Sequence, residues 1–321
     1  MSDTVQLSAT IPDDMAGLRL DQALAGLFPD YSRSRLKQWI VDGQVTVNGR
    51  PLRPKDKLRG GEAIEIAATL VEQTAWTGEN IALDIVYEDD DVIVINKPAG
   101  LVVHPAAGNQ AGTLVNALLH HAPELNALPR AGIVHRLDKN TSGLLIVART
   151  LSAHKHLVDQ LQARLCKREY QAVVNGVMIA GGKVDAPLAR HPLNRKRMAV
   201  VDEGREAISH FRVVERFRAH TLASVQLETG RTHQIRVHMA HIQFPIVGDP
   251  EYGGRLHMPK GATEALRDAL HGFKRQALHA VRLTVTHPRL GTPMEWSAPL
   301  PPDMMALIAV LRADVASDKA K

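Results

Sequence analysis

Residues 132–147 read Gly132-Ile-Val-His-Arg-Leu-Asp-Lys-Asn-Thr-Ser-Gly-Leu-Leu-Ile-Val147, a polar loop between two apolar segments. The run Leu144–Val147 is typical of a buried strand, and the apolar residues before His135 predict a strand that enters the loop. Between them, Asp138–Ser142 is rich in residues that favour turns. We therefore expect Asp138 to lie in a loop at the end of a rigid sheet, where catalytic side chains are often found.

Around this stretch, strand-like and helical segments follow one another without regular alternation. This order favours an α+β domain with a mixed, largely antiparallel sheet over a doubly wound α/β fold. The expected strands are 92–95, 144–147, 170–174, 208–214, 221–227 and 280–285, and the expected helices are 113–121, 153–165, 231–242 and 301–313.

A small module precedes this domain. Leu20, Leu24 and Leu27 recur at helical spacing, and Leu36, Ile40 and Val41 suggest a second short helix. Asn48-Gly49 between two β-prone segments, 45–47 and 63–67, is a hairpin signal. The 321 residues suffice for one small and one large domain. We expect a tail at 1–15, the small module at 16–73, a linker at 74–84, the large domain at 85–315 and a tail at 316–321.

The positive charge is concentrated in the small module. The whole chain carries a formal charge of +5, whereas the segment from Tyr31 to Arg59 holds eight basic and two acidic residues, a local charge of +6. A compact basic patch can displace counterions from a phosphate backbone. A solvated basic face without a polyanion partner is the alternative. The basic residues are Arg33, Arg35, Lys37, Arg50, Arg53, Lys55, Lys57 and Arg59.

A second basic cluster lies in a predicted loop of the large domain. Its five basic residues stand beside Asp202 and Glu203, which leaves a local charge of +3. We interpret it as a loop that contacts phosphates, with a solvated loop as the alternative. The basic residues are Arg190, Arg195, Lys196, Arg197 and Arg205.

Several features argue against other classes of protein. The chain has one cysteine, Cys166, and its first residues form no apolar run, which together favour a cytoplasmic location. No apolar stretch is long enough to span a bilayer. His233, His238 and His241 share a predicted helix, but no carboxylate or cysteine accompanies them at metal-ligand spacing. We expect a monomer with no metal, no small-molecule cofactor and no membrane partner.

A series of sequence blocks in fixed order identifies a family. His135-Arg136-Leu137-Asp138 is followed by Thr141-Ser142-Gly143, and further blocks flank both. These are Asn96–Gly100 with His104-Pro105, Lys167–Tyr170, Glu228–Arg236, Gly248–Pro250 with Tyr252-Gly253, and Gln276–Ala280. Over about residues 85–300 the chain resembles the RluA-type family of pseudouridine synthases, and the small module resembles an S4 RNA-binding domain.

The resemblance implies an isomerase that converts uridine in RNA to pseudouridine without a cofactor. Asp138 is then the nucleophile, and Arg231 is its basic partner. Tyr170 stacks on the uracil ring and is a candidate for removing the C5 proton, Leu278 forms an apolar wall, and Arg136 fills the space left by the flipped base. Without the motifs, the same residues would be read as a turn aspartate, a surface arginine, two core side chains and a structural ion pair.

The two-part arrangement is similar to family members that act on large-subunit ribosomal RNA. It implies 23S rRNA or the large-subunit particle as partner, in the stem-loop called helix 69. Another site in ribosomal or transfer RNA is an alternative within the family. A non-catalytic RNA-binding factor in ribosome assembly is an alternative from another class, and a metal-dependent RNA hydrolase is disfavoured because metal-ligand clusters are missing from the sequence.

Overall fold

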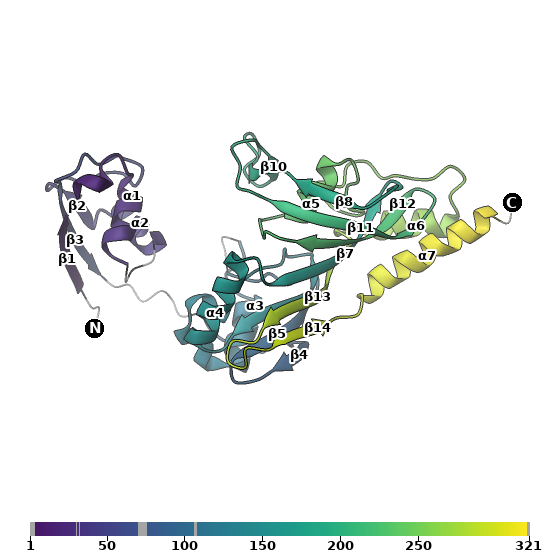
Figure 1. Ribbon diagram of the computed structural model, residues 1–321, viewed down its shortest axis with the longest axis horizontal. Helices are drawn as coiled ribbons and strands as arrows, with labels where there is room; N and C mark the ends of the chain where they lie inside the picture. The colour runs from purple at the N-terminus through teal and green to yellow at the C-terminus, as the bar shows by residue number, and fades with distance from the viewer. Residues whose placement is uncertain (1–3, 30, 32, 70–75, 106–107, 320–321) are drawn as a thin grey trace. The chain divides into compact units, whose positions relative to one another are not determined.

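The computed structural model describes residues 4–319 except 30, 32, 70–75 and 106–107. The chain divides into two units, Met1–Ala75 and Trp76–Lys321, and each buries a hydrophobic core of its own. Figure 1 shows the elements of both units along the chain. No helix among the described residues is both long and apolar enough to cross a membrane.

The first unit packs two helices against a small antiparallel sheet. Leu24 and Leu36 from the helices meet Ile64 and Ile66 of the central strand in its core. The predicted tail at 1–15 is therefore wrong in part, because residues 4–10 form a strand that pairs along its whole length with the central strand. The sheet order is β1-β3-β2, and the elements are β1 Thr4–Thr10, η1 Asp13–Met15, α1 Leu20–Leu27, α2 Arg33–Val41, β2 Val45–Val47 and β3 Ala63–Thr69.

The second unit is built on one large sheet. Within its described residues, nine strands are joined in the order β4-β5-β6-β13-β7-β12-β11-β8, with β14 paired to β13. Every pairing is antiparallel except that of β6 with β13, which confirms the predicted mixed, largely antiparallel α+β fold. The strands are β4 Ile85–Glu88, β5 Val92–Lys97, β6 Ser142–Ala148, β7 Lys167–Asn175, β8 Gly182–Asp185, β11 Ile208–Arg216, β12 His220–Leu227, β13 Leu278–Thr286 and β14 Pro293–Ser297.

Helices cover both faces of the sheet near β5 and β6. Ile93 and Leu145 belong to the core that includes α3, whereas Val94 and Ile146 belong to the core that includes α4. Successive residues of a strand face opposite ways, so burial on both faces explains why these runs are continuously apolar. The helices are α3 Leu114–His121, η2 Pro123–Ala127, η3 Pro129–Gly132, α4 Leu151–Gln162, α5 Gln234–His241, α6 Glu264–Gly272 and α7 Pro302–Lys319, the last yellow in Figure 1.

The parallel pair β6–β13 brings two distant segments into close contact. Ser142 and Gly143 pair with His279 and Ala280. A Cβ on Gly143 would lie 2.3 Å from the carbonyl oxygen of Ala280, so only glycine permits this approach. The start of β6, and with it the Asp138 loop, therefore lies against the start of β13.

Three segments differ from the sequence-based expectation. The predicted strand before the loop is reduced to a single antiparallel bridge between Ile133 and Val147. It follows the 3-10 turn Pro129–Gly132, in which Arg130 and Ala131 have φ of 55° and 51°. The predicted linker belongs to the large unit from Trp76 onward, where the Asn116 side chain donates to the carbonyl of Thr77. The predicted tail from 316 continues α7 as far as Lys319.

The second basic cluster lies on a two-stranded hairpin. β9 Leu188–Arg190 pairs with β10 Met198–Val200, and residues 191–197 form the connection. This hairpin stands at the upper edge of the unit in Figure 1.

Candidate active site

A cleft of about 790 Å³ opens beside the Asp138 loop in the second unit. All five residues that the sequence predicts for the reaction centre line it, although they come from segments far apart in the chain. They are Asp138, Arg136, Tyr170, Arg231 and Leu278.

The backbone of the Asp138 loop is held at several points. The amide of Thr141 donates to the Asp138 carbonyl at 3.0 Å, and the amide of Gly100 donates to the Lys139 carbonyl at 2.8 Å. The Gln276 side chain donates to the Thr141 hydroxyl at 3.0 Å. The loop is thus fixed before any substrate arrives, which is the requirement for a preorganised catalytic group.

Lys97 supports the same loop from beneath. Its side chain is fully buried, and its Nζ donates to the carbonyls of Pro98, Leu101 and Lys139 at 2.8, 3.0 and 3.1 Å. Burial lowers the pKa of Lys97 to about 7, while the Asp138 charge opposes that shift. Three carbonyl acceptors match the three donors of an ammonium group, so Lys97 ties the Asn96–Gly100 block to the Asp138 loop.

Asp138 forms an ion pair with Arg236. The Arg236 Nη1 lies 3.1 Å from Asp138 Oδ2, and the aspartate side chain remains 16% exposed to the cleft. This differs from the prediction, in which Arg231 is the partner. The Arg231 Nε donates instead to the carbonyl of Glu206 at 2.9 Å.

Other carboxylates hold Arg236 in place. Its Nε and Nη2 bind the two oxygens of Asp249 at 2.7 and 2.9 Å, and Nη2 also contacts Glu251 at 3.1 Å. Burial opposes the charge of Arg236, but its bonds to Asp249 and Asp138 outweigh burial and raise its pKa above the ordinary range. A bidentate partner fixes the guanidinium plane, and the guanidinium in turn orients the Asp138 carboxylate.

The start of α5 explains why Arg231 and Arg236 differ. The Gln234 side chain accepts from the Thr229 hydroxyl and the Arg231 amide, so residues 229–233 form a turn and the helix begins at Gln234. His233 adopts the left-handed conformation, φ 57°, which is uncommon for a non-glycine residue. The predicted helix at 231–242 is therefore three residues too long at its start. From the helix proper, Arg236 reaches Asp138.

His233 links this centre to Tyr252. Its Nε2 lies 3.9 Å from Asp138 Oδ1, and its Nδ1 lies 2.9 Å from the Tyr252 hydroxyl. The same hydroxyl accepts a hydrogen bond from the Met198 amide on β10. The basic hairpin is thereby bonded to the surroundings of Asp138.

Tyr170 and Leu278 form the apolar part of the cleft. Both are nearly buried, at 5% and 3% exposure, and they come from neighbouring strands β7 and β13. Burial raises the pKa of Tyr170 to about 12, so its phenol is neutral near pH 7. A neutral ring suits stacking, and it would have to lose its own proton before it could act as a base. Arg136 is exposed at the rim.

Apart from Arg136, the predicted RNA-contacting cations are not among the residues that line this cleft. Arg195 and Lys196 are exposed at the hairpin connection, whereas Arg197 stacks over Tyr252 with 4.9 Å to the ring centre. In the first unit, α2 carries Arg33, Arg35 and Lys37. Arg33 is half-exposed and forms an ion pair with the buried Asp21 at 2.7 Å, so part of its role is structural.

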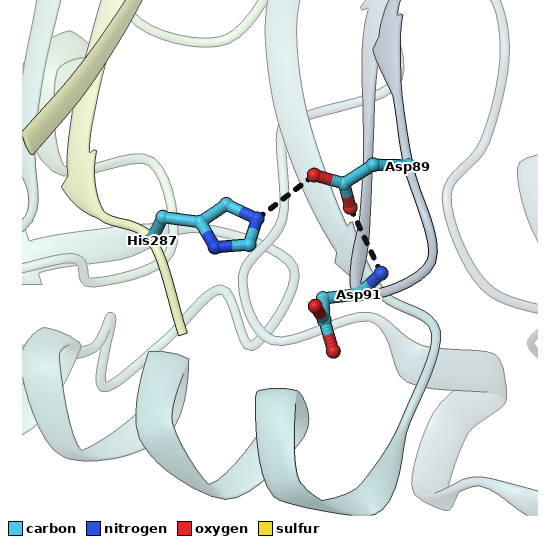
Figure 2. Close-up of side chains that lie close together, drawn as sticks. All are labelled: Asp89, Asp91 and His287. Atoms are coloured by element: carbon cyan, nitrogen blue, oxygen red, sulfur yellow. Dashed lines mark hydrogen bonds and ion pairs between the residues drawn. The ribbon is translucent and has the colours of Figure 1, made fainter. Parts of the chain in front are cut away.

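One group of side chains has the composition of a metal site. Asp89, Asp91 and His287 lie together at the turns after β4 and β13, as Figure 2 shows. The Nδ1 of His287 accepts from the amides of Arg289 and Leu290, which leaves the proton on Nε2, and Nε2 donates to Asp89 at 2.8 Å. Arg289 forms an ion pair with Asp91 at 2.7 Å. The group is thus joined by hydrogen bonds and one ion pair, which tie the two turns together.

Sequence reasoning assigned no role to Lys97, His233, Arg236 or Asp249. All four stand in the blocks that carry the family resemblance. The blocks indicate that these residues belong to the site, but they do not indicate which charged side chains face one another.

Comparison with known proteins shows the family of the chain. Residues 91–241 match the RNA pseudouridylate synthase family, and residues 18–64 match the S4 domain. The chain is 58% identical to ribosomal large subunit pseudouridine synthase D of Yersinia pestis, over 98% of this chain and 97% of that protein. It is 56% identical to the protein of the same name from Pseudomonas aeruginosa, over 98% of each chain.

A solved structure shares the fold. Human RNA pseudouridylate synthase domain containing 4 superposes with a TM-score of 0.56 at 26% identity, covering 71% of this chain and 92% of that one. Identity above 50% over nearly the whole length, together with both domain matches, shows that the chain belongs to the RNA pseudouridylate synthase family and is of the S4-containing type that includes the ribosomal large subunit pseudouridine synthases D.

Proposed function

We propose that this enzyme isomerises uridine to pseudouridine in the ribosomal RNA of the large subunit, with Asp138 as the nucleophile. The observation that carries the proposal is the Asp138–Arg236 ion pair, which faces a cleft walled by Tyr170 and Leu278. The substrate class follows from the relatives, which are named for the large ribosomal subunit.

The reaction needs a nucleophile and a place for a detached base. The N1–C1′ bond of uridine breaks, the base rotates, and a C5–C1′ bond forms while C5 loses a proton and N1 gains one. Asp138 attacks C1′ or the pyrimidine ring, or it assists formation of a glycal; the geometry is compatible with each. Arg236 holds the carboxylate in a fixed orientation, which is a condition for it to act as a nucleophile.

A uridine in folded RNA must leave its stack to reach Asp138. We propose that Arg136 at the rim occupies the vacated position, because a guanidinium plane can stack on bases. The flipped uracil then lies between Tyr170 and Leu278. These walls exclude water from the site, and the exclusion of water strengthens the electrostatic interactions of Asp138 with the substrate.

We further propose the helix 69 stem-loop of 23S rRNA as the target, free or in the large-subunit particle. The support is the resemblance of the whole chain to the synthases D, together with an S4 module whose basic patch suits phosphate contacts. The exposed Arg195 and Lys196 of the β9–β10 hairpin offer a second phosphate-contacting surface.

The deciding experiment is tritium release from rRNA labelled at uridine C5. Wild type should release tritium, while Asp138→Ala and Asp138→Asn should fall below about a thousandth of the wild-type rate and still bind RNA. Asp268→Asn, a change at an exposed aspartate on α6, is the matched control and should be fully active. Residual turnover above that level would exclude Asp138 as the nucleophile.

The substrate form is tested in the same assay. If naked rRNA gives no release, large-subunit particles and transfer RNA are assayed next. RNA binding without release on any of these would favour a non-catalytic RNA-binding factor over the proposed enzyme.

Removal of metal tests the proposed cofactor-free chemistry. After EDTA treatment and dialysis, wild type should retain its full rate of tritium release, because the proposed steps use only side chains of this chain. A rate that falls on chelation and returns with added metal would contradict the proposal.

A further inference from the structure

Arg168 is a buried cation in the active-site cleft. It precedes Tyr170 by two residues on β7, and the two side chains are 7% and 5% exposed. Residues two apart on a strand point to the same face, so Arg168 and Tyr170 share the face that lines the cleft.

The guanidinium of Arg168 has no partner within the described part of the chain. No carboxylate forms an ion pair with it there, and its buried Nε makes no hydrogen bond. The other deeply placed arginine, Arg236, has three carboxylate partners, and Arg164 at the cleft edge is paired with Glu206 and Glu228. A buried charge without a partner is costly, so Arg168 is built to meet an anion that the protein does not supply.

His135 adds a second unmet donor to the same cleft. Its Nε2 accepts from the amide of Ile146 at 3.2 Å, so the proton of the neutral ring lies on Nδ1. That Nδ1 is buried and has no hydrogen-bond partner in the described structure. Burial lowers the pKa of His135 to about 3, and the nearby charge of Arg168 acts in the same direction, which keeps the ring neutral.

Gly230 fixes the position of the Arg168 guanidinium. A Cβ on Gly230 would lie 2.6 Å from Arg168 Nη1, so a side chain there would push the guanidinium out of place. The segment that begins α5 therefore packs directly over Arg168.

We propose that Arg168 and His135 form a subsite for a backbone phosphate of the RNA, the one that adjoins the target uridine. This inference rests on the proposed function, in which the uracil lies against Tyr170. Two residues along a strand span about 6.8 Å, a distance that a single nucleotide covers between its base and its phosphate. A phosphate supplies both the negative charge that Arg168 needs and an acceptor for His135.

The first test measures binding of an rRNA stem-loop to full-length protein over a range of salt concentrations. Arg168→Gln should weaken binding about tenfold or more. It should also reduce the slope of log K against log salt by about 0.7 to 0.9, the value for one phosphate contact. Arg312→Gln, which removes the same charge from a surface ion pair with Glu215 outside the cleft, should leave both nearly unchanged.

The second test locates the phosphate. Each linkage of the stem-loop is replaced in turn by an uncharged methylphosphonate. The affinity of wild type should fall when the linkage next to the converted uridine is a methylphosphonate. The affinity of Arg168→Gln should not change with this replacement, because the contact is already absent. Gly230→Ala keeps the charge of Arg168 but displaces it, so this variant should show part of the affinity loss of Arg168→Gln. Because the linkage scan on wild type needs no variant, a misfolded Arg168→Gln does not remove the test.

Two results would overturn the phosphate subsite. One is an equal methylphosphonate penalty in wild type and Arg168→Gln, or no penalty at any linkage near the target. The other is a lower kcat for Arg168→Gln with unchanged affinity and salt slope, which would place the guanidinium on the base. Failure of the proposed function would give a different result. Wild type would release no tritium, while the methylphosphonate scan would still show the phosphate contact of Arg168.

Discussion

Asp138 depends on a guanidinium that is itself held by other carboxylates. Arg236 binds Asp249 with two nitrogens and has a third, Nη1, for Asp138. The orientation of the Asp138 carboxylate, the proposed nucleophile, is therefore set by a buried network of charged side chains. The basic partner is secured before the RNA binds.

We predict a large difference between the two arginines of this motif. Arg236→Gln should lower turnover about a hundredfold or more, because a misplaced carboxylate loses its attack geometry. It should also destabilise the fold by about 3–5 kcal/mol, because Asp249 is left buried without its partner. Arg231→Gln should cost less than about tenfold, since among the described residues the Arg231 side chain bonds only the Glu206 carbonyl.

Single-turnover tritium release and urea denaturation of both variants measure these effects. Arg236→Lys, which keeps the charge but not the bidentate geometry, is the matched control and should fall between wild type and Arg236→Gln. Equal losses for the Arg231 and Arg236 variants would show that the ion pair does not orient Asp138.

At this scale the sequence indicates which residues gather, but not which of them pair. The blocks identify Asp138, Tyr170 and Leu278 as neighbours, and all three line the cleft. The choice between Arg231 and Arg236 depends on where α5 begins, and that is set by the side-chain bonds of Gln234. Such local competition between side chain and backbone has no clear periodic signature.

Among the elements, the first unit is the clearest separate piece. It has its own core, and its helix α2 carries Arg33, Arg35 and Lys37. We predict that removal of residues 1–75 weakens RNA binding and flattens its salt dependence, because several phosphate contacts are lost together.

The truncation is checked by measuring affinity for the rRNA stem-loop at several salt concentrations. The remaining chain, 76–321, should keep the melting temperature of the second unit, because the large core lies wholly within it. An unchanged salt slope in a folded truncation would show that the basic patch is not an RNA surface.

Long, strongly patterned elements are predictable from the sequence, and short ones less so. The strands at 92–95 and 144–147 are confirmed because burial on both faces makes them continuously apolar. The Asn48-Gly49 turn is present, with positive φ at both residues, and β2 pairs antiparallel with β3 as predicted, although residues 48–62 rather than a two-residue turn connect the two strands. A short edge strand such as β8 forms because it pairs with β11, which is distant in the sequence. The local sequence pattern does not reveal this pairing.

Over the whole molecule, buried histidines link stability to pH. Burial lowers the pKa of His220 and of His279 to about 4, from the ordinary 6.5. The unfolded chain takes up these protons near pH 6.5, whereas the folded protein resists them until about pH 4. The free energy of unfolding should therefore fall as pH drops from about 6.5 to about 4, by up to about 1.4 kcal/mol per pH unit for each histidine.

Urea denaturation at several pH values between 4 and 7.5 measures this slope. His220→Gln removes one titrating group. The free energy of unfolding should therefore fall less steeply with decreasing pH, by the contribution of one histidine. The same substitution at the exposed His241 serves as the control. A His220 variant with the wild-type slope would contradict this account.

The contact between β6 and β13 also bears on when the enzyme becomes active. Ser142 and His279, whose side chains meet across this pair, are 137 positions apart in the chain. Such a contact closes a long loop and forms late in folding. During synthesis on the ribosome, Asp138 emerges well before the strand that completes its surroundings. A nascent chain therefore lacks the complete cleft around Asp138 until β13 has been translated, although its first unit has emerged long before.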